Sequence, residues 1–172
     1  TYNNPRALSA VLAGLARQTF RDFEILVADD GSGAETRAAL AAAAARSPQP
    51  VRHVWHEDQG VRRNTILNRA VLRAEGEYLV FLDGDCLPPP QWLAAHVAGA
   101  ERGWYVSGGK VLLSEALTQR VFAGRIPAEA LHRFTPLWRQ IAKRRRLVMS
   151  RIPLLRRALD FNRRERCGWV GE

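Results

Sequence analysis

The sequence predicts an α/β fold with a mixed, mostly parallel sheet flanked by helices. Short apolar runs alternate with longer segments of helical periodicity along the chain. Strands separated by such helices pair in parallel through right-handed crossovers. Two acidic turns each follow an apolar run, which places them at the carboxyl ends of strands, where open sheets bind ligands. With 172 residues and 47% apolar content, the chain can form one folded unit with a buried core.

The first half of the chain predicts helix, strand, helix and strand in that order. Asn4 is expected to cap the first helix, with Pro5 in its first turn. The apolar stripe of this helix consists of residues at helical spacing, namely Leu8, Val11, Leu12 and Leu15. We expect a strand at residues 23–28, an alanine-rich helix at residues 34–46 and a second strand at residues 51–56.

The second half continues this alternation. Residues 61–74 carry apolar side chains on one helical face, and Gly76 is placed to end that helix. Residues 78–82 are the most strand-like run of the sequence and lead into a second acidic turn, Asp83-Gly84-Asp85. Three prolines, 88–90, introduce a helix that contains Trp92, Leu93 and Val97.

The two acidic turns are expected to face one cleft at the edge of the sheet. Asp83 and Asp85 could hold a hard divalent cation that also takes oxygens from a diphosphate. Such an ion would act as a Lewis acid on the diphosphate, where charge develops if the diphosphate is a leaving group. Alone, each acidic sequence is typical of a turn or a helix cap, since Asp and Ser favour both positions. Two of them on one sheet edge favour a ligand site.

Basic and amide side chains lie between the two acidic turns. Arg62, Arg63 and Asn64 stand at an expected helix start, and Asn68 follows one turn later. Arg and Asn side chains near a helix start suit contacts to phosphate, ribose or base. This pattern is weak alone and gains meaning from the neighbouring carboxylates.

Four segments carry a resemblance to a known family. In chain order they are Thr1-Tyr2-Asn3-Asn4-Pro5, Val27-Ala28-Asp29-Asp30-Gly31-Ser32, residues 59–68, and Tyr78-Leu79-Val80-Phe81-Leu82-Asp83-Gly84-Asp85-Cys86-Leu87-Pro88. This order resembles the family 2 glycosyltransferases, which have the GT-A fold and a Rossmann-like sheet. The resemblance covers residues 1–114, and residues 108–114 resemble the segment after the donor site in bacterial polysaccharide and lipopolysaccharide members.

The resemblance implies a metal-dependent, inverting transferase whose donor is a nucleoside-diphosphate sugar, often a UDP-sugar. By position in the motifs, Tyr2 and Asn3 would line the nucleoside, and Asp29 or Asp30 would bind base or ribose. That pocket would be completed by Arg62 or Arg63 together with Asn64 or Asn68. Asp83 would face ribose or sugar, and Asp85, with Asp83, would ligate Mn²⁺ or Mg²⁺.

The sequence departs from the family pattern at two places. Family members have an apolar strand before the segment that begins here at Thr1, so we expect the sheet to lack that strand. The catalytic base usually sits in a Glu-Asp pair after a Gly-rich, Trp-containing segment, for which Glu172 is a weak candidate. We therefore divide the chain into a donor-binding core at 1–114 and a basic helical segment at 115–172, and expect weak donor binding without sugar transfer.

Positive charge is concentrated after residue 135. The whole chain has a net charge of +9, and residues 136–172 contain 11 basic against 3 acidic residues, a net +8. Arginines mixed with Leu, Ile, Val and Trp are typical of helices on anionic lipid, and equally of a solvated basic face. We expect a cytoplasmic protein, peripheral on the inner plasma-membrane face, with a growing glycan or lipid-linked sugar as acceptor. The two cysteines, Cys86 and Cys167, fit no disulfide framework, and neither a spanning helix nor a signal peptide is expected.

Three other protein classes share parts of the pattern. A phosphorelay receiver domain would explain both acidic turns, but it needs a later Lys-Pro, and Lys110 is followed by Val111. A haloacid-dehalogenase phosphatase expects Thr or Val where Cys86 stands. A basic nucleic-acid-binding module would explain the arginines, yet few aromatic residues interleave with them, so no nucleic-acid partner is expected. The four histidines lack metal-ligand spacing and are interpreted as surface or packing residues.

Overall fold

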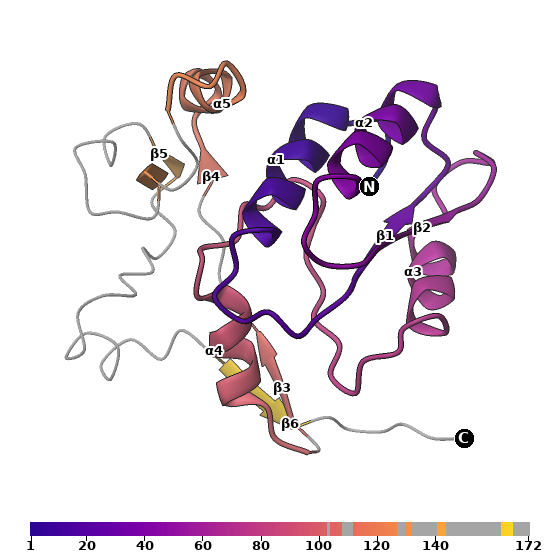
Figure 1. Ribbon diagram of the computed structural model, residues 1–172, viewed down its shortest axis with the longest axis vertical. Helices are drawn as coiled ribbons and strands as arrows, with labels where there is room; N and C mark the ends of the chain where they lie inside the picture. Colours follow the sequence, from indigo (N-terminus) through magenta and orange to yellow (C-terminus); the bar gives the residue numbers. More distant parts are fainter. Residues whose placement is uncertain (103, 108–111, 127–129, 132–140, 144–162, 167–172) are drawn as a thin grey trace. The chain divides into compact units, whose positions relative to one another are not determined.

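The computed structural model describes residues 1–102, 104–107, 112–126, 130–131, 141–143 and 163–166. The chain divides into two compact units, Thr1–Ala94 and Ala95–Glu172. The first unit contains, in order, α1 (Pro5–Leu15), β1 (Ile25–Asp29), α2 (Ala34–Ala44), β2 (Val51–Trp55), α3 (Arg63–Val71) and the start of α4 (Trp92–Gly99) (Figure 1). This alternation confirms the α/β class.

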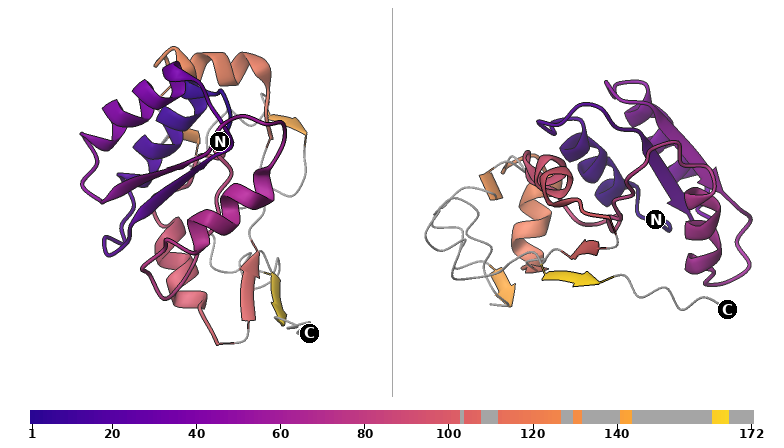
Figure 2. Two further views of the ribbon diagram at one scale, coloured as in Figure 1. Left: turned by 90° about the vertical axis from the view of Figure 1, so that its right-hand side faces the viewer. Right: turned by 90° about the horizontal axis from the view of Figure 1, so that it is seen from below.

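β1 and β2 form the parallel pair that organises the first unit. Their register runs from Ile25 opposite Val51 to Asp29 opposite Trp55, so both strands end at the same edge. Helices α1 and α2 lie side by side on one face of this pair, and α3 covers the other face (Figures 1 and 2). Because side chains alternate along a strand, odd-numbered β1 residues face α1 and α2, and even-numbered ones face α3.

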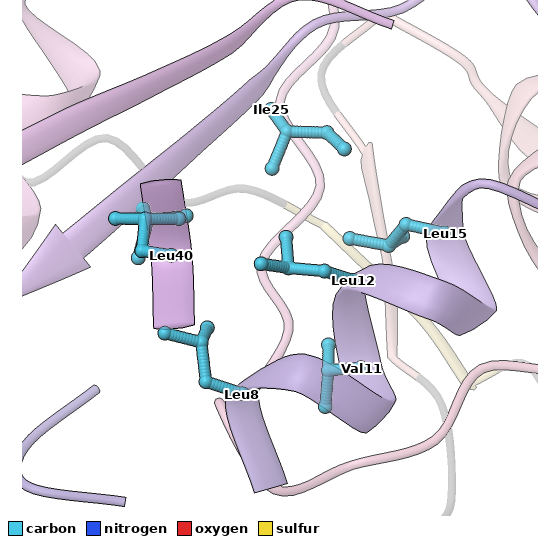
Figure 3. Packing of buried hydrophobic residues seen from close by; sticks show 7 residues of the cluster. Leu8, Val11, Leu12, Leu15, Ile25 and Leu40 are labelled. Atoms are coloured by element: carbon cyan, nitrogen blue, oxygen red, sulfur yellow. The ribbon is translucent and has the colours of Figure 1, made fainter. Parts of the chain in front are cut away.

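The hydrophobic core of the first unit lies between α1, α2 and β1. Figure 3 shows how leucines from both helices gather over Ile25 of β1. The buried members of this cluster are Leu8, Val11, Leu12, Leu15, Ile25, Val27 and Leu40. Burying each leucine side chain stabilises the fold by about 1.5–3 kcal/mol. The predicted apolar stripe of the first helix is therefore confirmed as its core-facing side.

α1 begins as the sequence predicts. The side chain of Asn4 accepts a hydrogen bond from Ala7 N at 3.2 Å, and Pro5 occupies the first helical position. After α1 ends, the fully buried Gln18 connects the helix to a distant loop. Its amide nitrogen donates to Gly14 O and to Pro89 O, and its oxygen accepts from Leu93 N at 2.9 Å. Gln18 thus fixes the segment between the second acidic turn and α4.

The prediction of a strand at residues 78–82 is wrong. The structure assigns no strand there, and 63% of Phe81 is exposed. A strand requires a neighbouring strand whose backbone N–H and C=O groups are available for hydrogen bonds. On the β1 edge away from β2, the hydrogen bonds described are those of Thr1, and residues 78–82 join neither β1 nor β2. Leu82 still packs, half-buried, against the core cluster.

The second unit contains two short antiparallel strand pairs and one more helix. β3 (Trp104–Ser107) pairs with β6 (Arg163–Arg166), and β4 (Leu112–Leu113) pairs with β5 (Ile141–Lys143). The helix α5 (Glu115–Phe122) is capped by the Ser114 side chain, which accepts from Leu117 N. The described strands thus form three separate pairs, one parallel and two antiparallel.

The basic segment after residue 135 is described at two places, Ile141–Lys143 and Arg163–Arg166, and both are strands. The rest of the predicted basic helical segment after residue 135, at residues 136–140, 144–162 and 167–172, lies outside the described residues, and so does Glu172. Among the helices that the structure describes, none is long and apolar enough to cross a membrane. The division that we predicted at residue 114 stays a prediction.

Candidate functional site

The two acidic turns meet around Thr1. Thr1 N donates to Ala28 O at 2.6 Å, and Thr1 O accepts from Asp30 N at 3.0 Å, so Thr1 is held at the carboxyl end of β1. On the second turn, a β-carbon added to Gly84 would lie 3.2 Å from Thr1 Cβ, closer than an ordinary contact. Glycine therefore lets the 83–85 turn approach β1, and the structure brings both predicted acidic turns to one edge.

The aspartates of the first turn face opposite sides of the sheet. Asp29 has no exposed surface, and its carboxylate accepts from Ser32 N at 2.9 Å and contacts His53 Nε2 at 2.8 Å. Asp30 keeps 12% of its side chain exposed; its Oδ1 lies 2.6 Å from His56 Nε2, and its Oδ2 accepts from Arg62 N at 2.9 Å. Of the two predicted candidates, Asp30 is the one with surface for a ligand.

Hydrogen bonds decide the charge of Asp30. Burial raises the pKa of its carboxyl group, but the hydrogen bonds from His56 and the Arg62 backbone outweigh burial and lower the pKa overall. A lowered pKa keeps the carboxylate ionised at neutral pH. An ionised carboxylate only accepts hydrogen bonds, so a ligand group that bonds to Asp30 would have to carry N–H or O–H.

The loop after β2 closes against the first turn at Gly31. Gly31 has φ of 97°, and a β-carbon there would lie 2.6 Å from Asp58 Cα, so glycine is required for both reasons. Asp58 in turn accepts from Tyr2 Oη at 2.8 Å, which raises the pKa of Tyr2. Asn3 accepts from Gly33 N and its own N donates to Ser32 Oγ. The predicted nucleoside residues Tyr2 and Asn3 therefore lie at this same edge.

Two consecutive residues at the start of α3 connect the acidic turns. Arg62 donates its backbone N–H to Asp30, and Arg63 Nη2 lies 2.6 Å from Asp83 Oδ1. Arg62 also donates from its guanidinium to Glu57 O at 2.7 Å. The Arg63 and Asp83 side chains are 68% and 39% exposed, so their ion pair contributes little to stability and can exchange partners.

Asn64 and Asn68 lie one turn apart on α3, which places them on one face of the helix. Both are exposed. Asn64 comes directly after Arg62 and Arg63 in the sequence. Their predicted contact with the donor stays a prediction.

The second acidic turn has the donor atoms for a divalent cation. Ligand atoms of Asp83, Asp85 and Cys86 all lie within 4.8 Å of one another, and both aspartates are exposed. Ion–oxygen bonds of about 2.0–2.6 Å allow one cation to join atoms so separated. The carboxylates fit Mn²⁺ or Mg²⁺, which prefer oxygen, whereas the Cys86 thiol is a softer donor. The turn therefore fits the predicted metal.

Two histidines contact the aspartates of the first acidic turn and were not predicted to do so. We interpreted His53 and His56 as surface or packing residues, but each contacts one aspartate of the first turn. A signal was present: His53 lies within the predicted second strand and His56 at its end. In a parallel pair, residues at that end stand beside the end of the neighbouring strand, which here carries Asp29 and Asp30.

Comparison with known proteins agrees with this geometry. Residues 1–159 match the family described as Glycosyl transferase family 2. The chain belongs to this family. The match includes every donor-binding and metal residue predicted from the resemblance, whereas Glu172 lies beyond it. The match also favours sugar transfer over the receiver, phosphatase and nucleic-acid-binding alternatives.

Three relatives show how widely this segment occurs. A validoxylamine A glucosyltransferase of Streptomyces hygroscopicus subsp. jinggangensis is 38% identical over 106 residues, 58% of this chain and 25% of that protein. A hyaluronan synthase of Pasteurella multocida is 31% identical over 99 residues, 57% of this chain and 10% of that protein. An undecaprenyl-phosphate 4-deoxy-4-formamido-L-arabinose transferase of Pseudomonas fluorescens is 33% identical over 114 residues, 62% of this chain and 32% of that protein. The matched stretch is thus a third or less of each relative's length.

Proposed function

We propose that this chain binds the donor in an enzyme that moves a sugar, with inversion, from a nucleoside diphosphate to a glycan or lipid-linked acceptor. One observation carries the proposal: two consecutive residues at the start of α3 join the two acidic turns, Arg62 to Asp30 and Arg63 to Asp83. A nucleoside and its diphosphate could therefore contact both turns at once. Family membership supports sugar transfer as the reaction class.

Asp30 is proposed to recognise the base. Its ionised carboxylate accepts but cannot donate, so it suits a base that presents an N–H, as uracil does at N3. Cytosine presents a lone pair at the same position and would be repelled. This chemistry favours a UDP-sugar, with Tyr2 and Asn3 beside the nucleoside and Asp29 supporting the turn through Ser32.

Asp83 and Asp85 are proposed to hold Mn²⁺ or Mg²⁺ together with the diphosphate. When bound, the cation would stabilise the charge that develops on the leaving diphosphate. Arg63 lies beside Asp83 in an exposed ion pair, so its guanidinium can turn to a phosphate oxygen without a large loss of stability. The donor then contacts carboxylates at its base and a cationic group at its diphosphate.

The acceptor hydroxyl is proposed to attack the anomeric carbon from the face opposite the diphosphate. The bond to the diphosphate breaks, and the hydroxyl proton passes to a general base within hydrogen-bonding distance. The names of two relatives, a hyaluronan synthase and an undecaprenyl-phosphate sugar transferase, support a glycan or lipid-linked acceptor. The concentration of positive charge after residue 135 supports attachment to the anionic inner face of the plasma membrane.

Calorimetric titration of the full-length protein with UDP, with and without Mn²⁺, tests the donor site. We expect Mn²⁺ to tighten UDP binding in the wild type, and Asp85→Asn to remove at least about tenfold of that gain, because an amide is a poorer ligand than a carboxylate. Asp22→Asn, at an exposed aspartate before β1, is the matched control and should keep the full Mn²⁺ effect. An Asp85→Asn protein with an undiminished Mn²⁺ effect would contradict the metal assignment.

A further inference from the structure

The His56 side chain is almost completely buried at the site, and packing alone does not explain it. Its side chain is 5% exposed, and its Nδ1 has no hydrogen-bond partner among the described residues. Leaving a buried polar atom unpaired costs about 1–3 kcal/mol. An apolar side chain of similar size would avoid that cost but would leave Asp30 Oδ1 without the His56 contact, so the role of the polar ring lies in its contact with Asp30.

The ring is placed by the register of the parallel strands. Asp29 stands opposite Trp55 as the last registered pair. Asp30 is the residue after β1, and His56 is the residue after β2. Both side chains therefore project to the α3 face at the carboxyl end of the sheet. The resulting contact, 2.6 Å between His56 Nε2 and Asp30 Oδ1, follows directly from the backbone arrangement.

The contact fixes the orientation of the Asp30 carboxylate. His56 binds Oδ1 and the Arg62 backbone N–H binds Oδ2, so rotation of the carboxylate would break one hydrogen bond or both. Because Asp30 is ionised and only accepts, Nε2 must carry the proton in this pair. Each carboxylate oxygen has a further lone pair, and the exposed 12% of the side chain leaves access to it.

We propose that His56 is a positioning residue for donor binding, whose Nε2–H holds the Asp30 carboxylate in the orientation that accepts the nucleoside. This inference rests on the proposed function. His56 does not touch the donor itself; it acts through Asp30. The other acid–histidine pair, Asp29 with His53, projects to the opposite face and contains an aspartate with no exposed surface, so it offers an internal comparison.

The experiment uses full-length protein and two probes in the presence of Mn²⁺: UDP, and pyrophosphate, which lacks the nucleoside. His56→Leu removes the N–H donor at similar size, and His56→Gln keeps an amide N–H close to the Nε2 position. We expect His56→Leu to weaken UDP binding about tenfold or more, the loss typical of a hydrogen bond to a charged group. His56→Gln should stay within about threefold of the wild type, and pyrophosphate affinity should be the same in all three proteins.

His53→Leu is the matched control, since it also removes a histidine from an aspartate of the same turn. It should lower the thermal unfolding temperature while the ratio of UDP to pyrophosphate affinity stays at the wild-type value. The inference is overturned if His56→Leu keeps wild-type UDP affinity, if His56→Gln loses as much as His56→Leu, or if His53→Leu changes the ratio equally. A wild-type protein that binds neither probe would overturn the proposed function as well.

Discussion

Asp29 and Asp30 are neighbours with the same side chain, and the strand that carries them gives them different surroundings. Alternation along β1 buries Asp29 beside His53 and Ser32, whereas Asp30 reaches the α3 face. From the sequence, either aspartate could have bound base or ribose. Which aspartate is available to a ligand depends on burial. Burial is set by packing partners from distant parts of the chain and cannot be predicted from a two-residue motif.

Substitution of Asp30 tests base recognition. Asp30→Asn removes the negative charge and places an N–H donor at the site, so we expect UDP affinity to fall about tenfold to a hundredfold. CDP affinity should fall much less, because the new amide can donate to cytosine N3. The ratio of UDP to CDP binding in the full-length protein measures the effect. Equal losses for both nucleotides would show that Asp30 does not read the base.

The pH dependence of base recognition follows from the same carboxylate. The pKa of Asp30 is lowered, so its carboxylate stays ionised at pH values where an ordinary aspartate is already protonated, and the charge is lost only as pH falls through the lowered pKa. We therefore expect the preference for UDP over CDP to stay constant between about pH 5 and pH 8, measured by calorimetry in matched buffers. A preference that disappears within that window would mean that another group reads the base.

At the scale of elements, the sequence predicted what local rules control. The cap at Asn4, the stripe on α1 and the order of helices and strands up to α4 follow from propensity and periodicity. Residues 78–82 show the limit of such rules. Their β-branched and aromatic composition favours a strand, but a strand also needs a partner backbone, and the sequence of the run contains no information on that partner.

The Gln18 side chain connects two distant elements, and no sequence motif predicts this interaction. It joins α1 to the Pro89 and Leu93 backbone across 71 and 75 positions of sequence. Gln18→Leu would leave a buried N–H and a buried carbonyl unpaired, so we expect the free energy of unfolding to fall by about 2–4 kcal/mol. Urea unfolding of the full chain measures this loss.

Thr19→Val is the matched control for Gln18. The Thr19 hydroxyl donates to Pro90 O at 3.2 Å from an exposed position, and its backbone N–H donates to the same oxygen at 2.8 Å. The backbone bond survives the substitution, so we expect a change below about 1 kcal/mol. A Gln18→Leu protein as stable as Thr19→Val would show that the buried amide does not hold the segment after the second acidic turn.

At the scale of the whole molecule, charge is distributed unevenly along the chain. Residues 1–135 have 15 basic and 14 acidic residues and are nearly neutral, whereas residues 136–172 have a net charge of +8. The nearly neutral residues 1–135 include the proposed donor site with its carboxylates. The positive charge lies in a separate part of the sequence, where it can bind a partner other than the donor.

Sedimentation with vesicles tests whether that partner is an anionic membrane. We expect the full-length protein to bind phosphatidylglycerol vesicles, and Arg144, Arg145 and Arg146 changed together to Gln to weaken binding by about 3 kcal/mol, near a hundredfold, since each basic residue near the surface contributes about 1 kcal/mol. The control changes Arg6, Arg46 and Arg69, all exposed in the first unit, and lowers the net charge equally. If both triple variants lose the same affinity for phosphatidylglycerol vesicles, the total charge of the protein and not the 136–172 segment determines lipid binding. If the wild type binds phosphatidylcholine vesicles as well as phosphatidylglycerol vesicles, the attachment is not electrostatic.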